Sequence, residues 1–313
     1  MKWHEYEDLP WVPVLPDGTS EAAHFARQER RKKEETTMGL EIQTSDKIEA
    51  PWTVWFMYSQ MGAGKTTSAA SFPSPLFLVP ANEGSELTLA QLKKKSIPFV
   101  RIGKRPDGTV VPARKHLSEI LGEIEKAHAQ MRLLLGRSAK ASAAGDEMTA
   151  AQLQKEADAV FPWQTIVLES LSHFSDMLVE DVSEGGNKKL DQQAWGLIGS
   201  YLRTVHSRLR NMDVHVVYTS LAKTQENDSG GIVSGGPNLI GQAAEKFPSA
   251  CDVVVYMEEL AGAGKDAAPI YRSFFRKYRW WQARTRFANF PDYMDNFNFA
   301  ELEPKIVGSA VTK

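Results

Sequence analysis

The chain has 313 residues, of which 42% are hydrophobic and 24% are charged, and its formal net charge is −2. This composition supports a folded core and excludes a uniformly basic coat for nucleic acid, so contacts with DNA have to come from local clusters. The single cysteine, Cys251, excludes an intrachain disulfide and a cysteine-based zinc site.

Residues 1–50 are predicted to form a polar N-terminal arm, in which prolines, charges and scattered aromatic residues are mixed. A polar helix over residues 20–36 carries the charge run RQERRKKEE. Such a run is more often a solvated face or a mobile arm than a tether for nucleic acid. The pattern changes at Pro51, where the main domain, residues 51–290, begins.

Apolar runs and helical patterns alternate through this domain. The runs TVWFMY (53–58) and PLFLV (75–79) predict buried strands on either side of a glycine-containing turn and an Ala/Ser-rich helix. A short strand or hairpin is expected over residues 97–111, around the turn PDG. Residues 116–160 are predicted to be a helical insert, whose first helix ends at Gly136 before the small-residue linker SAKASAAGDEM.

Strands resume after the insert with TIVLE (165–169), VHVVYTS (214–220) and DVVVYM (252–257), and a helix lies between the first two. Continuous β-branched runs that alternate with helices indicate a mainly parallel sheet covered on both faces, which is an α/β fold. The runs IYRSFF and WQARTRF predict an antiparallel C-terminal extension, and residues 291–313 are expected to be a C-terminal tail.

The motif SQMGAGKTTS, Ser59 to Ser68, lies between an apolar strand and a helix, the context in which phosphate-binding loops occur. Its glycines let main-chain N–H groups converge on phosphate oxygens. Lys65 is expected to neutralise the β- and γ-phosphates, and the Thr66 hydroxyl to complete the shell of a Mg²⁺ ion. Ser59 stands where the usual motif has glycine, and we expect it to strain the first turn of the loop. The predicted nucleotide-binding residues are Ser59, Gln60, Met61, Gly62, Ala63, Gly64, Lys65, Thr66 and Thr67.

The strand TIVLES ends in Glu169, at the place where an acid downstream of a phosphate loop holds Mg²⁺. Most such strands end in aspartate; glutamate keeps the charge but is one methylene longer, which shifts the metal geometry. ATP and Mg²⁺ are therefore the expected cofactors, and no base-reading motif separates ATP from GTP. A second GAGK sequence, in AGAGKD (261–266), lacks Ser or Thr after Lys265 and is interpreted as a surface hairpin loop.

With these motifs placed, the chain resembles the RecA-like ATPases, and more closely the phage-encoded ATP-binding proteins associated with single-strand annealing recombination. The similarity runs from about Trp52 to Phe287, without the helical insert. It rests on the order of the segments SFPSPLFLVPANEGSE, TIVLESLSHF, VHVVYTS, GGPNLIGQAAEKFPSACDVVVYM and ARTRF. The resemblance implies a RecA-like P-loop NTPase fold with a mainly parallel central sheet, the helical insert and the antiparallel C-terminal extension.

The resemblance also implies catalytic roles, beginning with that of Lys65. Glu83 in ANEG takes the place of the acid that polarises the attacking water; the alternative is that it only caps the following turn, and Glu86 is the reserve candidate. Arg284 and Arg286 match arginine fingers that reach the γ-phosphate of a neighbouring subunit, which implies a homo-oligomer, either a ring or a filament. The alternative for both arginines is a strand that faces DNA or solvent.

Two segments, residues 180–191 and 223–237, match the loops with which RecA-like proteins hold single-stranded DNA. Both are rich in glycine and are expected to be mobile, and ordinary surface loops are the alternative. Gln225 is expected to sense the γ-phosphate and couple it to loop order. The candidate DNA-contacting residues are Lys188, Lys189 and Lys223.

The segment FFRKYRWWQARTRF (274–287) interleaves basic and aromatic residues, as nucleic-acid interfaces do, but the same alternation suits a core or a subunit interface. We assign Trp281 to a subunit interface and leave Trp280 open. The seven histidines show no metal-ligand spacing on a helix, so structural or surface roles are expected for them.

These patterns predict a RecA-like ATPase that binds single-stranded DNA in phage recombination, annealing or replication, with ATP-dependent assembly and with phage recombination or replication proteins as partners. Two alternatives stay open: an ATP-driven helicase, loader or remodelling ATPase, and a nucleotide-gated interaction module with little hydrolysis. No segment approaches the ~18 apolar residues that cross a bilayer. We therefore expect a cytoplasmic protein of the phage-infected bacterial cell, with no membrane partner.

Overall fold

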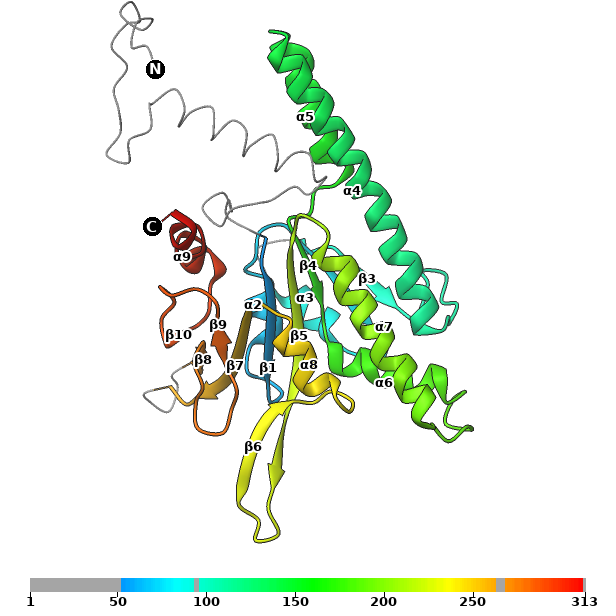
Figure 1. The fold of residues 1–313 in the computed structure, drawn as a ribbon, viewed down its shortest axis with the longest axis vertical. Coiled ribbons are helices and arrows are strands. Elements are labelled where there is room, and N and C mark those ends of the chain that lie inside the picture. Colours follow the sequence, from blue (N-terminus) through cyan, green and yellow to red (C-terminus); the bar gives the residue numbers. More distant parts are fainter. Residues whose placement is uncertain (1–51, 93–95, 263–267, 312–313) are drawn as a thin grey trace, which may run out of the picture. The chain divides into compact units, whose positions relative to one another are not determined.

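A twisted sheet with a parallel centre organises the chain (Figure 1). The computed structural model describes residues 52–92, 96–262 and 268–311. The strand order is β10-β8-β7-β1-β5-β4-β2-β3, and the strands from β7 to β3 run parallel. These parallel strands are β1 (Val54–Ser59), β2 (Pro75–Pro80), β3 (Phe99–Ile102), β4 (Thr165–Leu168), β5 (His215–Glu226) and β7 (Val253–Leu260).

The remaining strands pair antiparallel, with β8, β9 and β10 on the β7 side of this centre and β6 along the far end of β5. They are β6 (Ile232–Pro237), β8 (Ile270–Phe274), β9 (Arg284–Thr285) and β10 (Tyr293–Asp295). The helices are α2 (Lys65–Ala69), α3 (Ser85–Gln91), α4 (Ala113–Ala143), α5 (Glu147–Val160), α6 (Leu171–Val182), α7 (Gln192–Arg210), α8 (Ala243–Ser249) and α9 (Phe299–Val311). The expected α/β class, with a mainly parallel sheet, a helical insert and an antiparallel C-terminal extension, is confirmed.

Apolar residues of β1 alternate between the two faces of the sheet, because successive side chains of a strand point to opposite faces. Phe56 and Tyr58 join the core formed with α4, α6, α7 and α8. Trp55 and Met57 join the core on the other face, where α2 and α9 pack. A strand that is buried on both faces reads as a continuous apolar run, which is why the sequence located β1 so closely.

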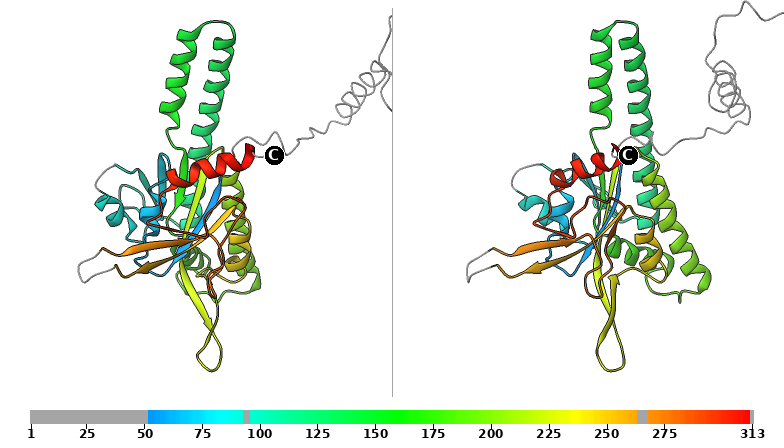
Figure 2. Two further views of the ribbon diagram at one scale, coloured as in Figure 1. Left: turned by 90° about the vertical axis from the view of Figure 1, so that its left-hand side faces the viewer. Right: turned by 60° about the vertical axis from the view of Figure 1, so that its left-hand side comes forward.

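The helical insert is a two-helix hairpin that extends away from the sheet (Figures 1 and 2). The prediction that the first helix of the insert ends at Gly136 is wrong, because α4 continues to Ala143 and only a short turn separates it from α5. A single glycine costs a helix about 1 kcal/mol relative to alanine, and the Ala, Ser and Lys residues beyond it favour helix enough to continue. Leu134, Leu153 and Ala157 form the small core that holds the two helices together.

The strand β5 is longer than the run VHVVYTS indicated, and it forms a hairpin with β6 that projects beyond the sheet (Figure 1). The segment 223–237, expected to be a mobile loop, is therefore largely paired strand. Its turn lies at residues 227–231, where the Asn227 side chain accepts a hydrogen bond from the main-chain N–H of Gly231. The ladder hydrogen bonds of the hairpin compensate for a composition that resembles a loop.

Residues 291–311 do not form a separate tail in the structure. The strand β10 adds to the sheet beside β8, and α9 places Phe299, Leu302 and Ile306 in the core. Phe299 stacks on Phe72, with ring centroids 4.2 Å apart. Each such buried side chain contributes about 1.5–3 kcal/mol to folding. The boundary expected at residue 290 therefore does not separate two units.

The assignment of Trp281 to a subunit interface is wrong. Its side chain is 6% exposed and stacks on Tyr256, with ring centroids 4.3 Å apart, inside the core of its own chain. Gly235 of β6 lies against the same indole, so close that a side chain there would overlap it. Trp280, which was left open, is partly buried beside Trp281.

Several predictions concern residues outside the part of the chain that the structure describes. These are the polar arm, its helix over residues 20–36 and most of the AGAGKD segment, whose flanking strands β7 and β8 do pair as a hairpin. Among the described helices, none combines the length and apolar character needed to cross a membrane.

Candidate nucleotide-binding site

The phosphate-binding motif leaves the carboxyl end of β1 and enters α2. Ser59 is the last residue of β1 and is not among the described non-glycine residues with positive φ. The strain expected from serine at this position is therefore absent, because the chain needs no glycine conformation until Gly62. The helix α2 has only five residues, and it is shorter than the Ala/Ser-rich sequence indicated.

Lys65 is buried and is held by oxygens of its own loop. Its Nζ donates to Ser59 Oγ at 2.8 Å and to the carbonyl oxygen of Gln60 at 3.1 Å. Burial lowers the pKa of the ammonium group, and the carboxylates of Glu169 and Glu83 oppose this shift. Serine at position 59 thus gives the lysine a side-chain partner that glycine lacks, and a bound phosphate would compete for the same ammonium group.

Two glycines give the loop its conformation. Gly62 and Gly64 have φ values of 84° and 80°, a region that is strained for residues with a side chain. A Cβ atom on Gly64 would also lie 3.0 Å from the ring of Tyr271. Tyr271 is on β8, so the C-terminal extension packs directly against the phosphate-binding loop.

Thr66 and Glu169 meet at the start of α2, although Thr66 follows β1, Glu169 follows β4, and β5 lies between these two strands. The Thr66 hydroxyl donates to Glu169 Oε1 at 2.8 Å. Glu169 is 2% exposed, and its other oxygen, Oε2, is buried without a hydrogen-bond partner among the described residues. A hydroxyl and a carboxylate with a free oxygen are the donor set that Mg²⁺ uses beside nucleotide phosphates, so these residues fit the ion.

The pKa of Glu169 is raised to about 7, first by burial and second by the charge of Glu83. Burial makes this carboxyl resist ionisation more than the nearby Lys65 ammonium favours it, and a bound cation would add to the effect of the lysine. The group is therefore partly protonated at neutral pH, and a positive ligand would favour its carboxylate form.

This raised pKa predicts how the stability of the metal-free protein depends on pH. Between the ordinary value of 4.5 and about 7, the folded protein binds a proton at Glu169 that the unfolded chain releases. The free energy of unfolding therefore falls as pH rises through this window, and Glu169→Gln removes that contribution. Thermal unfolding in chelator at about pH 5 and pH 8 should show a larger loss of Tm for the wild type than for the variant. Equal losses in the two proteins would contradict the assignment.

Glu83 enters the same pocket from the turn after β2. Its Oε2 accepts a hydrogen bond from the main-chain N–H of Ser170 at 2.8 Å and lies 2.7 Å from His173 Nδ1. The reserve candidate, Glu86, is instead paired with Arg101 at 2.6 Å and does not line the pocket. The structure therefore distinguishes the two acids that the sequence left as alternatives.

A pocket of about 460 Å³ brings these groups together, although they come from segments far apart in the sequence. Lys65, Thr66, Glu83 and Glu169 all line it. The other predicted loop residues that line it are Met61, Gly62, Gly64 and Thr67, whereas Ser59, Gln60 and Ala63 do not.

The two candidate arginine fingers lie near the amino end of β7, because β9 pairs with its first residues. The phosphate-binding loop follows the carboxyl end of the parallel neighbour β1. The Arg284 guanidinium donates to the main-chain oxygens of Pro248, Ser249 and Cys251, and so holds the end of α8. Arg286 is about half exposed and lies 3.7 Å from Asp252. Neither arginine reaches the phosphate pocket of its own chain, so a catalytic role for either requires a second subunit.

The candidate DNA-contacting lysines are all exposed. Lys188 and Lys189 lie in the turn region after α6, and Lys223 lies on β5. Gln225 is exposed on the hairpin, where its Oε1 accepts a hydrogen bond from Ser234 Oγ at 2.8 Å. Gln225 does not line the pocket, which the same strand reaches through Leu221.

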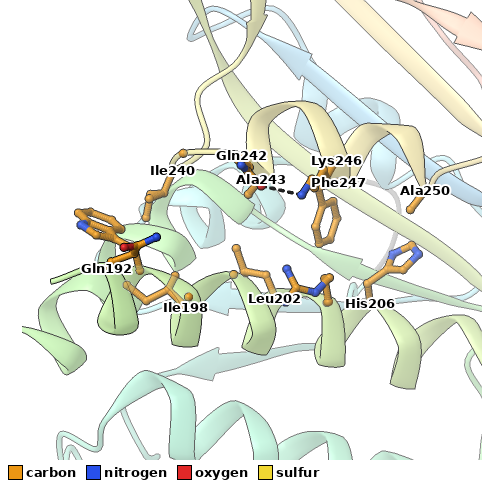
Figure 3. Close-up of a pocket in the computed structure, with 15 residues that line it drawn as sticks. Gln192, Ile198, Leu202, His206, Ile240, Gln242, Ala243, Lys246, Phe247 and Ala250 are labelled. Carbon is orange, nitrogen blue, oxygen red and sulfur yellow. Dashed lines mark hydrogen bonds between the residues drawn. The ribbon is translucent and has the colours of Figure 1, made fainter. Parts of the chain in front are cut away.

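A second hollow, of about 830 Å³, lies between α7 and α8 (Figure 3). Its walls are mainly apolar, with Leu202, Ile240 and Phe247 facing the space between the helices. Lys246 donates to Gln242 Oε1 at its rim. No predicted nucleotide or metal residue lines this hollow, so it is separate from the phosphate pocket.

The sequence did not predict that His173 and Tyr271 line the pocket. His173 was assigned a structural or surface role because it has no metal-ligand partner, yet its position three residues after Ser170 places it over Glu83 at the start of α6. Tyr271 reaches the pocket only because β8 folds back along β7, and nothing local to its sequence signals that contact.

Comparison with known proteins shows the family. A family model described as an AAA domain matches residues 51–287, which is most of the chain. No curated protein matches this chain. Among solved structures, a KaiC-like protein from the hyperthermophilic archaeon Pyrococcus horikoshii OT3 is similar at 14% identity, over 76% of this chain and 84% of that chain, with a TM-score of 0.35. The match over residues 51–287, together with the phosphate-binding loop at Lys65, shows that the chain belongs to the AAA-domain family of P-loop ATPases.

Proposed function

We propose that the chain hydrolyses ATP in the pocket around Lys65, and that it acts as a RecA-like ATPase on single-stranded DNA. The observation that carries the first part is the meeting of Lys65, the Thr66–Glu169 pair and Glu83 in one pocket. These groups supply what phosphoryl transfer to water requires: neutralised phosphates, a metal site and a carboxylate base. The test of this first part is the rate of phosphate release by the wild-type protein with and without Mg²⁺.

The roles of the residues follow from their positions. Lys65 would leave its loop oxygens for the phosphates, and Thr66 and Glu169 would hold Mg²⁺, which supplies further neutralisation of the phosphate charge. Glu83 would accept a proton from the attacking water. The water oxygen then forms the new bond to the γ-phosphorus, and the bridging oxygen of ADP leaves with the electron pair of the broken bond.

Assembly into a ring or filament is part of the same proposal, because no arginine of the described residues lines the pocket. Arg284 and Arg286 remain the candidates for a finger that acts on a neighbouring subunit. Arg286 is the better placed of the two, since it is about half exposed and its ion pair with Asp252 is long, at 3.7 Å. Arg284 is already bound to three main-chain oxygens.

The DNA part of the proposal rests on the resemblance and on the exposed lysines after α6 and on β5. Phosphates of a single strand would contact Lys188, Lys189 and Lys223. On this proposal the protein works in phage recombination, annealing or replication, in the cytoplasm of the infected cell and beside other phage recombination or replication proteins.

Single-stranded DNA is expected to raise ATP turnover, and the double variant Lys188→Ala/Lys189→Ala to weaken DNA binding. Each lost phosphate contact lowers the slope of log affinity against log salt concentration by about 0.7. The measurement is fluorescence anisotropy of a labelled oligonucleotide at several salt concentrations, together with turnover. The matched control is Lys126→Ala/Lys140→Ala on α4, which removes the same charge from the helical insert. An ATP turnover rate that single-stranded DNA leaves unchanged at every protein concentration would contradict the DNA part of the proposal.

A nucleotide-gated interaction module with little hydrolysis is the second candidate, and one observation favours it. Glu169 is buried and its pKa is raised, so the metal site is less charged before nucleotide arrives than one with an ionised acid. On this view the pocket would bind ATP tightly and hydrolyse it rarely. The kcat of the wild-type protein separates the candidates, because a gated module binds ATP without sustained phosphate release.

A further inference from the structure

The contact between Glu83 and His173 carries an inference about how the pocket works, and it rests on the proposed hydrolysis of ATP. We propose that His173 is a positioning residue for Glu83: its Nδ1–H and the main-chain N–H of Ser170 bind one carboxylate oxygen, which leaves the other oxygen to face the attacking water.

Hydrogen-bond geometry assigns the proton on the imidazole. His173 Nδ1 lies 2.7 Å from Glu83 Oε2 and 2.8 Å from Ser170 Oγ. A carboxylate oxygen only accepts hydrogen bonds, so Nδ1 has to carry the proton at this distance. A bare nitrogen would place two lone pairs against each other. Ser170 Oγ then acts as an acceptor, which agrees with its role as the cap of α6, where it also accepts from the main-chain N–H of His173.

The two oxygens of Glu83 are therefore not equivalent. Oε2 has two donors, Ser170 N–H and His173 Nδ1–H. Oε1 has no hydrogen bond to any described residue, and Glu83 lines the phosphate pocket beside Lys65 and Thr66. An orientation fixed at one oxygen directs the free oxygen, which is what a base needs for in-line attack by water.

His173 is well placed to fix that orientation, because it projects from a packed helix rather than from a loop. Leu171, Phe174 and Leu178 of α6 are fully or almost fully buried, so the first turn of the helix is anchored in the core. Glu83 itself lies in the turn between β2 and α3, held there by its N–H bond to the oxygen of Pro80. A rigid helix thus positions a residue whose own backbone is less constrained.

The charges around His173 favour this arrangement. Glu83 faces it from the turn after β2, and Asp176 faces it from the next turn of α6. Burial raises the pKa of Asp176, and the histidine opposes this shift. The imidazole thus interacts electrostatically with one acid on each of two elements.

The test compares ATP turnover, the KM for ATP and affinity for a fluorescent ATP analogue in the wild type and in His173→Ala. Misplacing a catalytic group by about 1 Å costs on the order of 100-fold, so kcat is expected to fall about 10- to 100-fold while KM and analogue affinity stay within about twofold. His173→Asn should restore most of the rate, since its amide N–H replaces Nδ1–H. The matched control is His206→Ala, another partly buried histidine on a helix, which should leave kcat unchanged.

A double-mutant cycle with Glu83→Gln separates this inference from the proposed function. If His173 acts through Glu83, His173→Ala adds no further loss of kcat in the Glu83→Gln background. Equal losses in His173→Ala and His173→Asn, full additivity with Glu83→Gln, or a wild-type kcat in His173→Ala would each overturn the positioning role alone. A wild-type kcat in Glu83→Gln itself would overturn the proposed hydrolytic role of Glu83.

Discussion

Glu83→Gln is expected to lower kcat for ATP hydrolysis by about 10²- to 10⁴-fold, the range that a general base contributes, while ATP and Mg²⁺ still bind. Glutamine keeps the size of the side chain and its contact with the main-chain N–H of Ser170, but it cannot accept a proton from water. The measurement is steady-state phosphate release, with binding of a fluorescent ATP analogue followed in parallel.

The matched control for this prediction is Glu86→Gln. Glu86 lies three residues further along and is paired with Arg101 outside the pocket, so its loss should leave kcat within about threefold, as for a surface ion pair worth at most about 1 kcal/mol. An equal drop in both variants would mean that the turn after β2, rather than the Glu83 carboxylate, is what turnover requires.

Lys65→Ala is expected to weaken nucleotide binding by about 10- to 100-fold, because a hydrogen bond to a charged group is worth about 1.5–3 kcal/mol and each 1.4 kcal/mol is a factor of ten. The ammonium group is buried and interacts with the carboxylates of Glu169 and Glu83. No other lysine or arginine of the described residues lines the pocket to replace it. Titration with a fluorescent ATP analogue in Mg²⁺ measures the effect.

A natural control for Lys65 is present in the sequence, in the second GAGK segment. Lys265 follows the same letters but has no Ser or Thr after it, so Lys265→Ala should leave nucleotide affinity unchanged. If the Lys265 variant loses nucleotide affinity and the Lys65 variant retains it, the nucleotide does not bind at the start of α2.

The strands of the parallel centre were predictable to within a few residues, with β5 running longer at its far end, for a physical reason. Apart from the edge strand β3, their first residues are buried on both faces, so each appears in the sequence as an apolar run, and β1 and β4 end at the motifs that carry Lys65 and Glu169. The order of motifs then indicated that Thr66, Glu83 and Glu169 would share one site, and the structure brings them together.

What the sequence did not reveal depends on contacts between distant segments. Trp281 was expected at an interface, but Tyr256 and Gly235 enclose it within the chain. Tyr271 contacts Gly64 because β8 folds back on β7. His173 had no partner at helical spacing, since its partner, Glu83, lies ninety residues earlier in the turn after β2.

ATP hydrolysis with Mg²⁺ in the pocket around Lys65 and Glu83 is the activity from which the other predictions follow. The most direct test is phosphate release by the purified wild-type protein, measured with Mg²⁺ and again in chelator, with the Lys65→Ala protein prepared in the same way as the background. We predict sustained release that requires Mg²⁺ and exceeds the Lys65→Ala background by at least about tenfold. Release equal to that background, or unchanged in chelator, would contradict the account.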